Sequence, residues 1–404
     1  MAPYAPAWQM NMHKNINNCV CCNSPNMKKF IDLGEQPLAN NLINQEGDEY
    51  SEFPLEVKYC DVCWHSQLSI AVDPKTLFQN YYYVTGTSRT MNEYCESLAK
   101  KIYNIFGRKA NILDIACNDG TLLEKFSKFD WDLTGVEPAQ NIAPMARAKG
   151  IEVYNKFFAS EKIEFGKKFE VITALNVFAH VPNPLEFMRE CKRNLSKNGI
   201  IVIQTSQRDM VEDRQFDTIY HEHISFFSAK SMQKLCDRAG LKLYRIDTPS
   251  IHGGSYVFYI SENRQVQQSV TQRIDKEQEK GRFDKEIYTQ FQSDILQIKK
   301  NARQVLEGKR IIGFGAAAKG IVFLNFINAK IECVIDENPL KQGKIIPKLN
   351  IPIKSLESLP TSGDYEVAVL AWNFYDEIIL RINQKDRNII KFFPETQQTI
   401  EDIR

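Results

Sequence analysis

The chain has 404 residues, of which 43% are hydrophobic and 25% are charged, so it is long enough for two or three domains with their own cores. Its 51 basic and 50 acidic side chains nearly balance, which excludes a strong net positive charge that would attract nucleic acid or an anionic membrane to the whole protein. There is no run of 18 apolar residues, and the start lacks a charged segment followed by an apolar core, so we expect a cytoplasmic protein without a membrane partner. We also expect a monomer that does not bind nucleic acid.

Five of the ten cysteines lie close to the start of the chain. Cys19-x-x-Cys22 and Cys60-x-x-Cys63 are two knuckles, each able to give two thiolates to one tetrahedral ion, and they predict a structural zinc site. Cys21 is a spare thiol that could compete with Cys19 or Cys22. Disulfides or free thiols are the alternative, disfavoured by a cytoplasmic setting. The intervening loop-rich sequence is too short for a core, so the ion would hold together a small module ending near residue 75.

Residues 77–89 combine three tyrosines with a Gly-Thr-Ser turn. This composition suits a lid over a ligand and equally suits a packed connector between domains. Apolar residues then recur at helical spacing over residues 91–106, which predicts a helix leading into the main domain.

The main domain opens with a buried strand, residues 112–116, followed by a tight turn at Gly120 and a helix. A second strand ends in Glu137, where a carboxylate can accept hydrogen bonds from a ribose diol. These features fit NAD as well as S-adenosylmethionine. However, the turn has one glycine and the carboxylate of Asp114, which is poor for a pyrophosphate and good for a sulfonium ligand with an amino group.

Further strands at residues 169–175 and 199–205 alternate with a helix at 184–195, which predicts a parallel sheet with ligands at the carboxyl ends of its strands. Residues 176–180 follow one such end, and His180 there is equally consistent with an ordinary helix start. Residues 217–226 follow another, and they concentrate Tyr220, His221, Glu222 and His223, groups able to move protons near neutral pH. A polar loop, or half of a metal site formed by His-x-His, are the alternatives.

Two later motifs suit phosphate groups. Residues 241–247 and 256–261 predict antiparallel strands joined through His252-Gly-Gly-Ser255, where the glycines allow a turn at a ligand and Ser255 has a donor hydroxyl.

Residues 265–308 carry an apolar stripe that predicts one or two amphipathic helices bridging domains. The loop Gly313-Phe-Gly315-Ala-Ala-Ala-Lys319-Gly then opens a last strand–loop–helix unit suited to a nucleotide diphosphate or to NAD.

The motifs at residues 112–123, 176–182, 217–227, 252–255, 313–320 and 371–374 occur in this order behind the two knuckles. The combination resembles the three-domain sugar C-methyltransferases that act on nucleotide-linked 4-keto-deoxysugars, over nearly the whole chain. The resemblance implies an α/β protein with a zinc-binding module (1–76), a Rossmann-like class I methyltransferase core (77–264) and a helical connector with a C-terminal Rossmann-like domain that helps to hold the nucleotide-diphosphate sugar (265–404).

The resemblance also implies roles for individual residues. The methyl donor, S-adenosylmethionine, would lie against Asp114, Ala116, Asn118, Gly120, Glu137, Phe158, Ala159, Asn176 and Val177. The catalytic group would comprise Tyr220, Glu222, His223 and His180. The substrate would contact His252, Ser255, Gly315, Lys319 and Asn373. This sequence departs from the commoner family pattern in having Asp114 in place of Glu, and Ala in place of Pro before Ala-Lys319.

The chemistry that these residues permit is methylation of a carbon next to a ketone. We expect His223 to remove the proton, Glu222 to orient or charge it, and Tyr220 or His180 to stabilise the enolate oxygen. Transfer to oxygen or nitrogen of a related sugar is an alternative, since it needs a base and the same donor without a ketone. An NAD-dependent nucleotide-sugar oxidoreductase and a nonenzymatic zinc-dependent binding module are two others.

Overall fold

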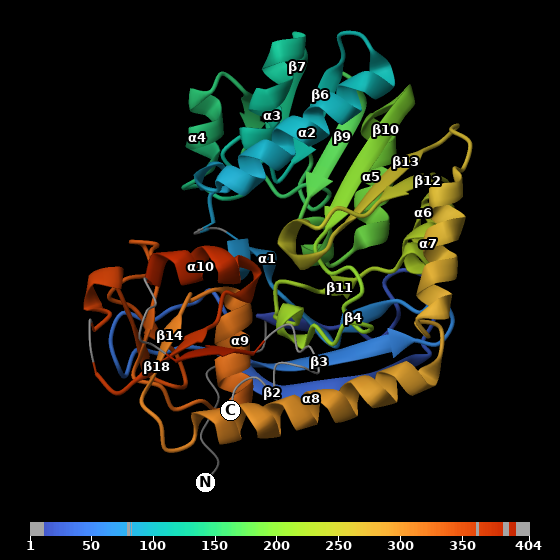
Figure 1. Cartoon of the computed structure of the whole chain (residues 1–404). Helices are drawn as coiled ribbons and strands as arrows, with labels where there is room; N and C mark the ends of the chain where they lie inside the picture. The colour runs from blue at the N-terminus through green and yellow to red at the C-terminus, as the bar shows by residue number, and fades with distance from the viewer. Residues whose placement is uncertain (1–11, 79–80, 82, 361–362, 383–387, 393–404) are drawn as a thin grey trace. The chain divides into compact units, whose positions relative to one another are not determined.

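The computed structural model describes residues 12–78, 81, 83–360, 363–382 and 388–392 (Figure 1). The chain forms two compact units, and each is assembled from segments that are distant in sequence. Unit 1 comprises Met1–Lys28, Lys58–Asp209 and Glu222–Phe283, and unit 2 comprises Lys29–Val57, Met210–His221 and Asp284–Arg404. The α/β class expected from the sequence is confirmed.

The main sheet of unit 1 has the strand order β12-β13-β10-β9-β6-β7-β8 within the described residues (Figure 1). The strands from β10 to β8 are parallel, and β13 runs antiparallel to both β10 and β12. The parallel strands therefore bring their carboxyl ends to one edge, where ligands bind in such sheets. The bounds are β6 Asn111–Ile115, β7 Asp132–Val136, β8 Glu152–Tyr154, β9 Phe169–Leu175, β10 Leu195–Thr205, β12 Lys242–Asp247 and β13 Tyr256–Ser261.

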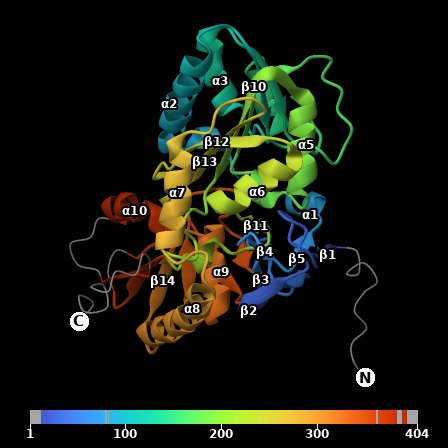
Figure 2. The same cartoon turned by 90° about the vertical axis from the view of Figure 1, so that its right-hand side faces the viewer.

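Helices cover both faces of this sheet, as Figure 2 shows. On one face, α2 (Arg89–Phe106) and α3 (Thr121–Phe126) pack on the strands, and on the other face α5 (Pro184–Asn194) and α6 (Ala229–Ala239) do so. The central strands are apolar on both sides because both faces are covered. Unit 1 also contains β1 (His13–Asn15), β4 (Ser66–Leu68), β5 (Ile70–Val72), α1 (Pro74–Phe78), α4 (Ala143–Ala148), β11 (Ser225–Phe226) and α7 (Gln268–Glu279).

Unit 2 has a sheet of order β16-β17-β15-β14-β18-β19 within the described residues. All neighbouring strands are parallel except β16 and β17. Two strands, β2 (Met27–Pro37) and β3 (Glu52–Cys60), contain residues of both units. The other elements are α8 Lys285–Leu306, β14 Ile311–Phe314, α9 Ala318–Ile327, β15 Cys333–Ile335, β16 Ile345–Ile346, β17 Ile351–Lys354, β18 Glu366–Val369, α10 Tyr375–Ile382 and β19 Ile389–Lys391.

Several elements expected from the sequence are confirmed: the helix beginning near residue 91 is α2, the amphipathic stretch 265–308 holds α7 and α8, and β12 pairs antiparallel with β13. The three domain boundaries stay a prediction. In the described part of the chain, no helix combines the length and the apolar composition that crossing a bilayer requires.

Candidate active site and zinc centre

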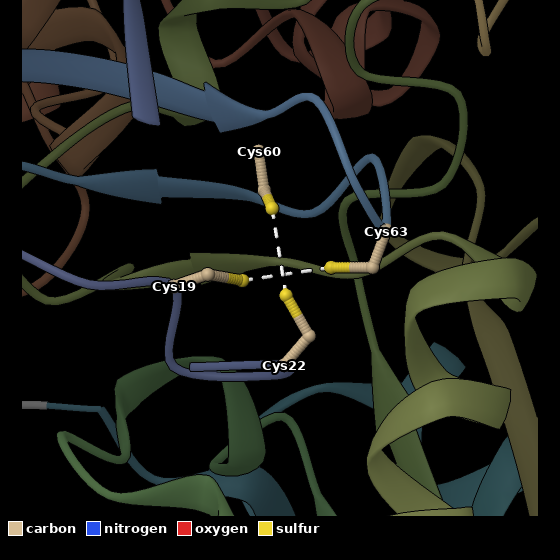
Figure 3. Close-up of side chains that lie close together, drawn as sticks. All are labelled: Cys19, Cys22, Cys60 and Cys63. Atoms are coloured by element: carbon tan, nitrogen blue, oxygen red, sulfur yellow. Dashed lines mark hydrogen bonds between the residues drawn. The ribbon is translucent and has the colours of Figure 1, made fainter. Parts of the chain in front are cut away.

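Four sulfur atoms converge in unit 1, as Figure 3 shows for Cys19, Cys22, Cys60 and Cys63. All four Sγ atoms lie within 4.8 Å of one another, and the distances Cys19–Cys63 and Cys22–Cys60 are both 3.5 Å. Four thiolates about 2.3 Å from a tetrahedral ion would be separated by about 3.8 Å, so the residues present fit zinc. Among the described residues this is the one group of possible metal ligands, and the His-x-His pair does not form another.

The backbone shapes each knuckle for this purpose. The amide of Asn23 donates to the carbonyl of Cys19, and the amide of Trp64 donates to the carbonyl of Cys60. Asn23 and Trp64 both have left-handed backbones, with φ of 65° and 62°. The residue after each second cysteine thus turns the chain so that both sulfurs of its knuckle face the same point.

Cys21 is outside the ligand set and is fully buried. In the absence of an ion, burial raises the pKa of its thiol well above the ordinary value. Arg238 of α6 donates to its carbonyl oxygen, which ties the first knuckle to the helix layer of unit 1. The competition that the sequence left open between Cys21 and its neighbours is therefore decided geometrically in favour of Cys19 and Cys22.

Left-handed backbone conformations gather among the residues expected to hold the methyl donor. Ala116, Asn118, Ala159 and Asn176 have φ between 53° and 63°, which side chains with a Cβ rarely adopt. Three of these follow the carboxyl ends of the neighbouring strands β6 and β9, and Ala159 follows β8. Gly120, with φ of 77°, completes the first turn, where a Cβ would lie 2.5 Å from Ile151. Strained turns at one edge of a parallel sheet are typical of a ligand site.

Asp114 lies at this edge with 4% of its surface exposed. Burial raises the pKa of its carboxyl group to about 7. The hydroxyl of Thr173 donates a hydrogen bond of 2.6 Å to this group, which lowers the pKa and partly offsets the effect of burial. The nearby carboxylate of Glu137 also raises this pKa. A cationic ligand group beside Asp114 would lower it again, since opposite charges favour the ionised form.

Glu137 follows β7 and links two turns of the site. Its carboxylate accepts from the backbone amides of Asn118 and Ala139, both at 2.8 Å. Each carboxylate oxygen keeps a second lone pair, so the group can still accept from a ribose diol. Burial raises the pKa of Glu137, whereas the two amides lower it.

The tyrosine-rich stretch expected as a lid or a connector is tied to the donor turn. The side chain of Asn118 accepts from the amide of Thr85 at 2.9 Å and donates to the carbonyl of Tyr83 at 3.0 Å. Asp119 accepts from the amide of Gly86 at 3.2 Å. The segment 83–86 therefore lies against the turn between β6 and α3, among the residues expected to hold the methyl donor.

We expect the affinity for S-adenosylmethionine to rise about tenfold as pH rises from about 6 to about 8. The folded pKa of Asp114 lies near 7, so its carboxyl group is neutral below that pH and attracts the cationic donor only above it. Titration calorimetry across this range measures the effect. Asp114→Asn should flatten the profile, and an affinity of the unmodified protein that stays constant or falls with pH would contradict this role.

Two of the candidate catalytic residues of unit 1 are buried, and the third, His180, is half-buried beside one of them. Glu222 and His223 are 4% and 5% exposed, and the His180 and His223 rings have their centroids 5.2 Å apart. His180 also stacks on Phe78 of α1 at 5.4 Å. The surrounding protein shields the His180 imidazole from water, and this loss of solvation lowers its pKa to about 4. His180 is therefore a neutral imidazole near pH 7, able to donate or accept a hydrogen bond.

Tyr220 belongs to unit 2, in the segment Met210–His221. Asp217 anchors this segment: its carboxylate accepts from the indole Nε1 of Trp372 at 3.1 Å and pairs with the ammonium of Lys319 at 3.3 Å. The side chain of Asp217 is 2% exposed, and a buried charge of this kind requires its partners. The charge of Lys319 is thus balanced within the protein, which gives this lysine a second role besides the substrate contact expected of it.

The structure places the remaining substrate candidates in both units. In unit 1, Ser255 is fully buried and its hydroxyl donates to the carbonyl of Ile251 at 2.9 Å, so it shapes its own loop. The side chain of His252 lies outside the described residues. In unit 2, Gly315 has φ of 93° and a Cβ there would meet Ala371 at 2.5 Å, while Asn373 is exposed.

Sequence reasoning missed residues that hydrogen-bond to the candidate site residues from within the sheet. Thr173 holds Asp114, and Gln204 of β10 accepts from the hydroxyl of Tyr94 at 2.6 Å and donates to Asn176 at 3.4 Å. A threonine or glutamine within an apolar strand could have drawn attention as a polar group needing a partner. The identity of that partner is decided by strand register, which single-sequence patterns do not give.

Three family models match the chain in succession. They are a zinc binding domain over residues 19–78, a methyltransferase domain over 88–246, and a C-methyltransferase C-terminal domain over 250–394. C-methyltransferase NovU of Streptomyces niveus is 28% identical over 387 residues, covering 90% of this chain and 91% of that protein. The chain is similar to C-methyltransferases over most of its length. It is an S-adenosylmethionine-dependent methyltransferase, with its four N-terminal cysteines as the zinc site.

Other similar proteins match a smaller part of the chain. Ubiquinone biosynthesis O-methyltransferase of Actinobacillus pleuropneumoniae is 25% identical over 166 residues, covering 36% of this chain and 70% of that protein. A solved S-adenosylmethionine-dependent methyltransferase of Thermotoga maritima is 15% identical with a TM-score of 0.35, covering 43% of this chain and 91% of that one. Magnesium protoporphyrin IX methyltransferase of Synechocystis, with bound S-adenosylhomocysteine, is 10% identical with a TM-score of 0.36, covering 43% and 83%.

Proposed function

We propose that this C-methyltransferase methylates a nucleotide-linked 4-keto-deoxysugar at the carbon next to the ketone. The observation that carries the proposal is the burial of Glu222 and His223 beside the neutral imidazole of His180, in the unit that also holds the donor turns. A buried base next to a neutral hydrogen-bond donor is what enolisation requires. The C-methyltransferase C-terminal domain at residues 250–394 supports carbon as the acceptor.

In the proposed mechanism, His223 takes the proton from the carbon beside the ketone, and Glu222 stabilises the charge that the imidazole gains. His180, or Tyr220 of the adjoining segment, donates a hydrogen bond to the enolate oxygen. Asp114 and Glu137 would hold S-adenosylmethionine, which would supply an electrophilic methyl group through cleavage of its sulfur–methyl bond. The new carbon–carbon bond replaces the lost carbon–hydrogen bond, and the products are the methylated ketone and S-adenosylhomocysteine.

The alternatives fare differently. The similarity to methyltransferases favours methyl transfer over an NAD-dependent oxidoreductase or a binding module without catalysis. Transfer to oxygen or nitrogen of a related sugar would use the same donor site and base, and the match of an O-methyltransferase to part of the chain is the observation in its favour.

The test is to incubate the purified protein with S-adenosylmethionine and a panel of nucleotide-linked 4-keto-deoxysugars. We expect one of them to gain about 14 mass units, the mass that replacement of hydrogen by methyl adds, on a ring carbon adjacent to the ketone, located by tandem mass spectrometry. The matching sugars with a hydroxyl in place of the ketone serve as the control and should remain unchanged. A methyl group on oxygen or nitrogen would exclude the enolate mechanism.

A further inference from the structure

A buried network of charges fixes the chain just beyond β10. Asp209 is 7% exposed and has a left-handed backbone with φ of 58°. Its carboxylate accepts from Arg273 and, at 3.1 Å, from Lys280. Arg273 also donates at 2.7 Å to the hydroxyl of Tyr256, which donates to Glu277. Helix α7 and strand β13 therefore hold this strained residue in place next to the carboxyl end of a central strand.

Arg208, the residue before it, has a guanidinium group that lies beside this network but keeps a hydrogen-bond donor without an acceptor in the part of the chain that the structure describes. Its Nη1 donates to the carbonyl of Thr248 at 3.0 Å. Its Nε is buried and 3.5 Å from the carboxylate of Asp209, with no hydrogen-bond acceptor among the described residues. The side chain keeps 23% of its surface exposed. A buried donor without an acceptor costs free energy unless a ligand or water supplies one.

The guanidinium also lies against the glycine turn of the motif at residues 252–255. A Cβ at Gly254 would come within 3.1 Å of Nη2 and within 3.3 Å of Cζ and Nε, and its backbone has φ of 121°. Glycine is therefore required here both by conformation and by the approach of the arginine. The chain just beyond β10 and the glycine turn therefore meet at the guanidinium of Arg208.

Three cationic side chains meet the single carboxylate of Asp209. They are Arg273, Lys280 at 3.1 Å and Arg208 at 3.5 Å. Lys319 of unit 2, the cation expected from the sequence to meet the diphosphate, is already paired with Asp217. A forked guanidinium matches the geometry of two phosphate oxygens, which a lysine cannot do.

We propose that Arg208 binds the phosphate oxygens of the nucleotide-linked substrate beside the turn of Gly253 and Gly254. This inference rests on the proposed function, since it assigns the diphosphate of that substrate to a residue of unit 1. The neighbouring Gln207 is 3% exposed and its Oε1 has no donor among the described residues, so it offers an acceptor that a hydroxyl of the same ligand would satisfy.

The experiment measures binding of thymidine diphosphate and uridine diphosphate to the full chain by calorimetry, with thymidine and uridine as phosphate-free controls. We expect Arg208→Met to weaken diphosphate binding by about tenfold or more and to leave S-adenosylhomocysteine binding within about twofold. Arg208→Lys should lose less, because it keeps the charge without the fork. Arg89→Met, which removes an exposed arginine of α2, is the matched control and should bind like the unmodified protein.

Two results would overturn the assignment: diphosphate affinity of Arg208→Met within about twofold of the unmodified protein, or diphosphates that bind the unmodified protein no better than the free nucleosides. Retained binding of S-adenosylhomocysteine by Arg208→Met shows that unit 1 of this variant is folded. If Arg208→Met does not fold, Arg208→Lys is the variant to measure.

If diphosphates bind through Arg208 but no nucleotide-linked ketosugar is methylated, the proposed function fails and the phosphate site stands. If methylation occurs and Arg208→Met keeps the KM of the sugar substrate, the site fails and the function stands.

Discussion

His223→Asn is expected to lower kcat by about 10²- to 10⁴-fold, the range associated with removal of a general base. Asparagine keeps a polar group of similar reach in a position that is 5% exposed, yet its amide cannot accept the substrate proton. The measurement pairs turnover with deuterium exchange in heavy water without the methyl donor. Exchange at the carbon next to the ketone should slow together with methylation, and the affinity for S-adenosylmethionine should stay within about twofold.

A matched control comes from His13→Asn on β1, a histidine of the same unit with no assigned role in the chemistry. It should keep kcat within about twofold. Near-normal turnover of His223→Asn with unchanged deuterium exchange would remove His223 from the role of base. If His180→Asn abolishes exchange instead, the two imidazoles have exchanged roles.

The methyltransferase core could be predicted because its signals are local. The run of apolar residues around Asp114, the turn at Gly120 and the acid at Glu137 each lie within a few residues of the structure they specify. The two knuckles are equally local, since each spans four residues. For that reason the sequence also identified the four zinc ligands, while the exclusion of Cys21 depended on the backbone turn after Cys22.

What could not be predicted depends on contacts between distant segments. Residues 29–57 join unit 2, where Phe30 packs edge-on against Tyr288 and Phe291 of α8 at 5.0 and 5.5 Å. The pairing of Asp217 with Lys319 joins residues about a hundred positions apart and gives that lysine a second role besides the substrate contact expected of it. Arg208 stands in a polar loop, where nothing in the neighbouring sequence distinguishes it from a solvated arginine. Its role emerges only once Thr248 and Gly254 are placed beside it.

Cys60→Ser is expected to remove zinc from the protein and to lower the melting temperature of unit 1 by roughly 10 °C or more. Structural zinc contributes about 10–16 kcal/mol in zinc-finger peptides, comparable with the whole stability of a typical domain. The effect should extend beyond the knuckles, because Cys60 and Cys63 belong to the same buried cluster as Phe227 and the helix layer of α5 and α6. Zinc content by mass spectrometry and calorimetric melting measure the two consequences.

Cys21→Ala is the matched control, since it changes a buried cysteine of the same knuckle that lies outside the ligand set. It should keep one zinc per chain and cost about 1 kcal/mol, the scale of a small lost side chain in a core. Loss of zinc from Cys21→Ala, or one retained zinc in Cys60→Ser, would show that the ligand set is different. Loss of zinc with an unchanged melting temperature would show that the ion does not stabilise the core. Because the knuckles and the main sheet of unit 1 share this core, we expect the protein to lose methyl transfer together with zinc when it is heated with a chelator.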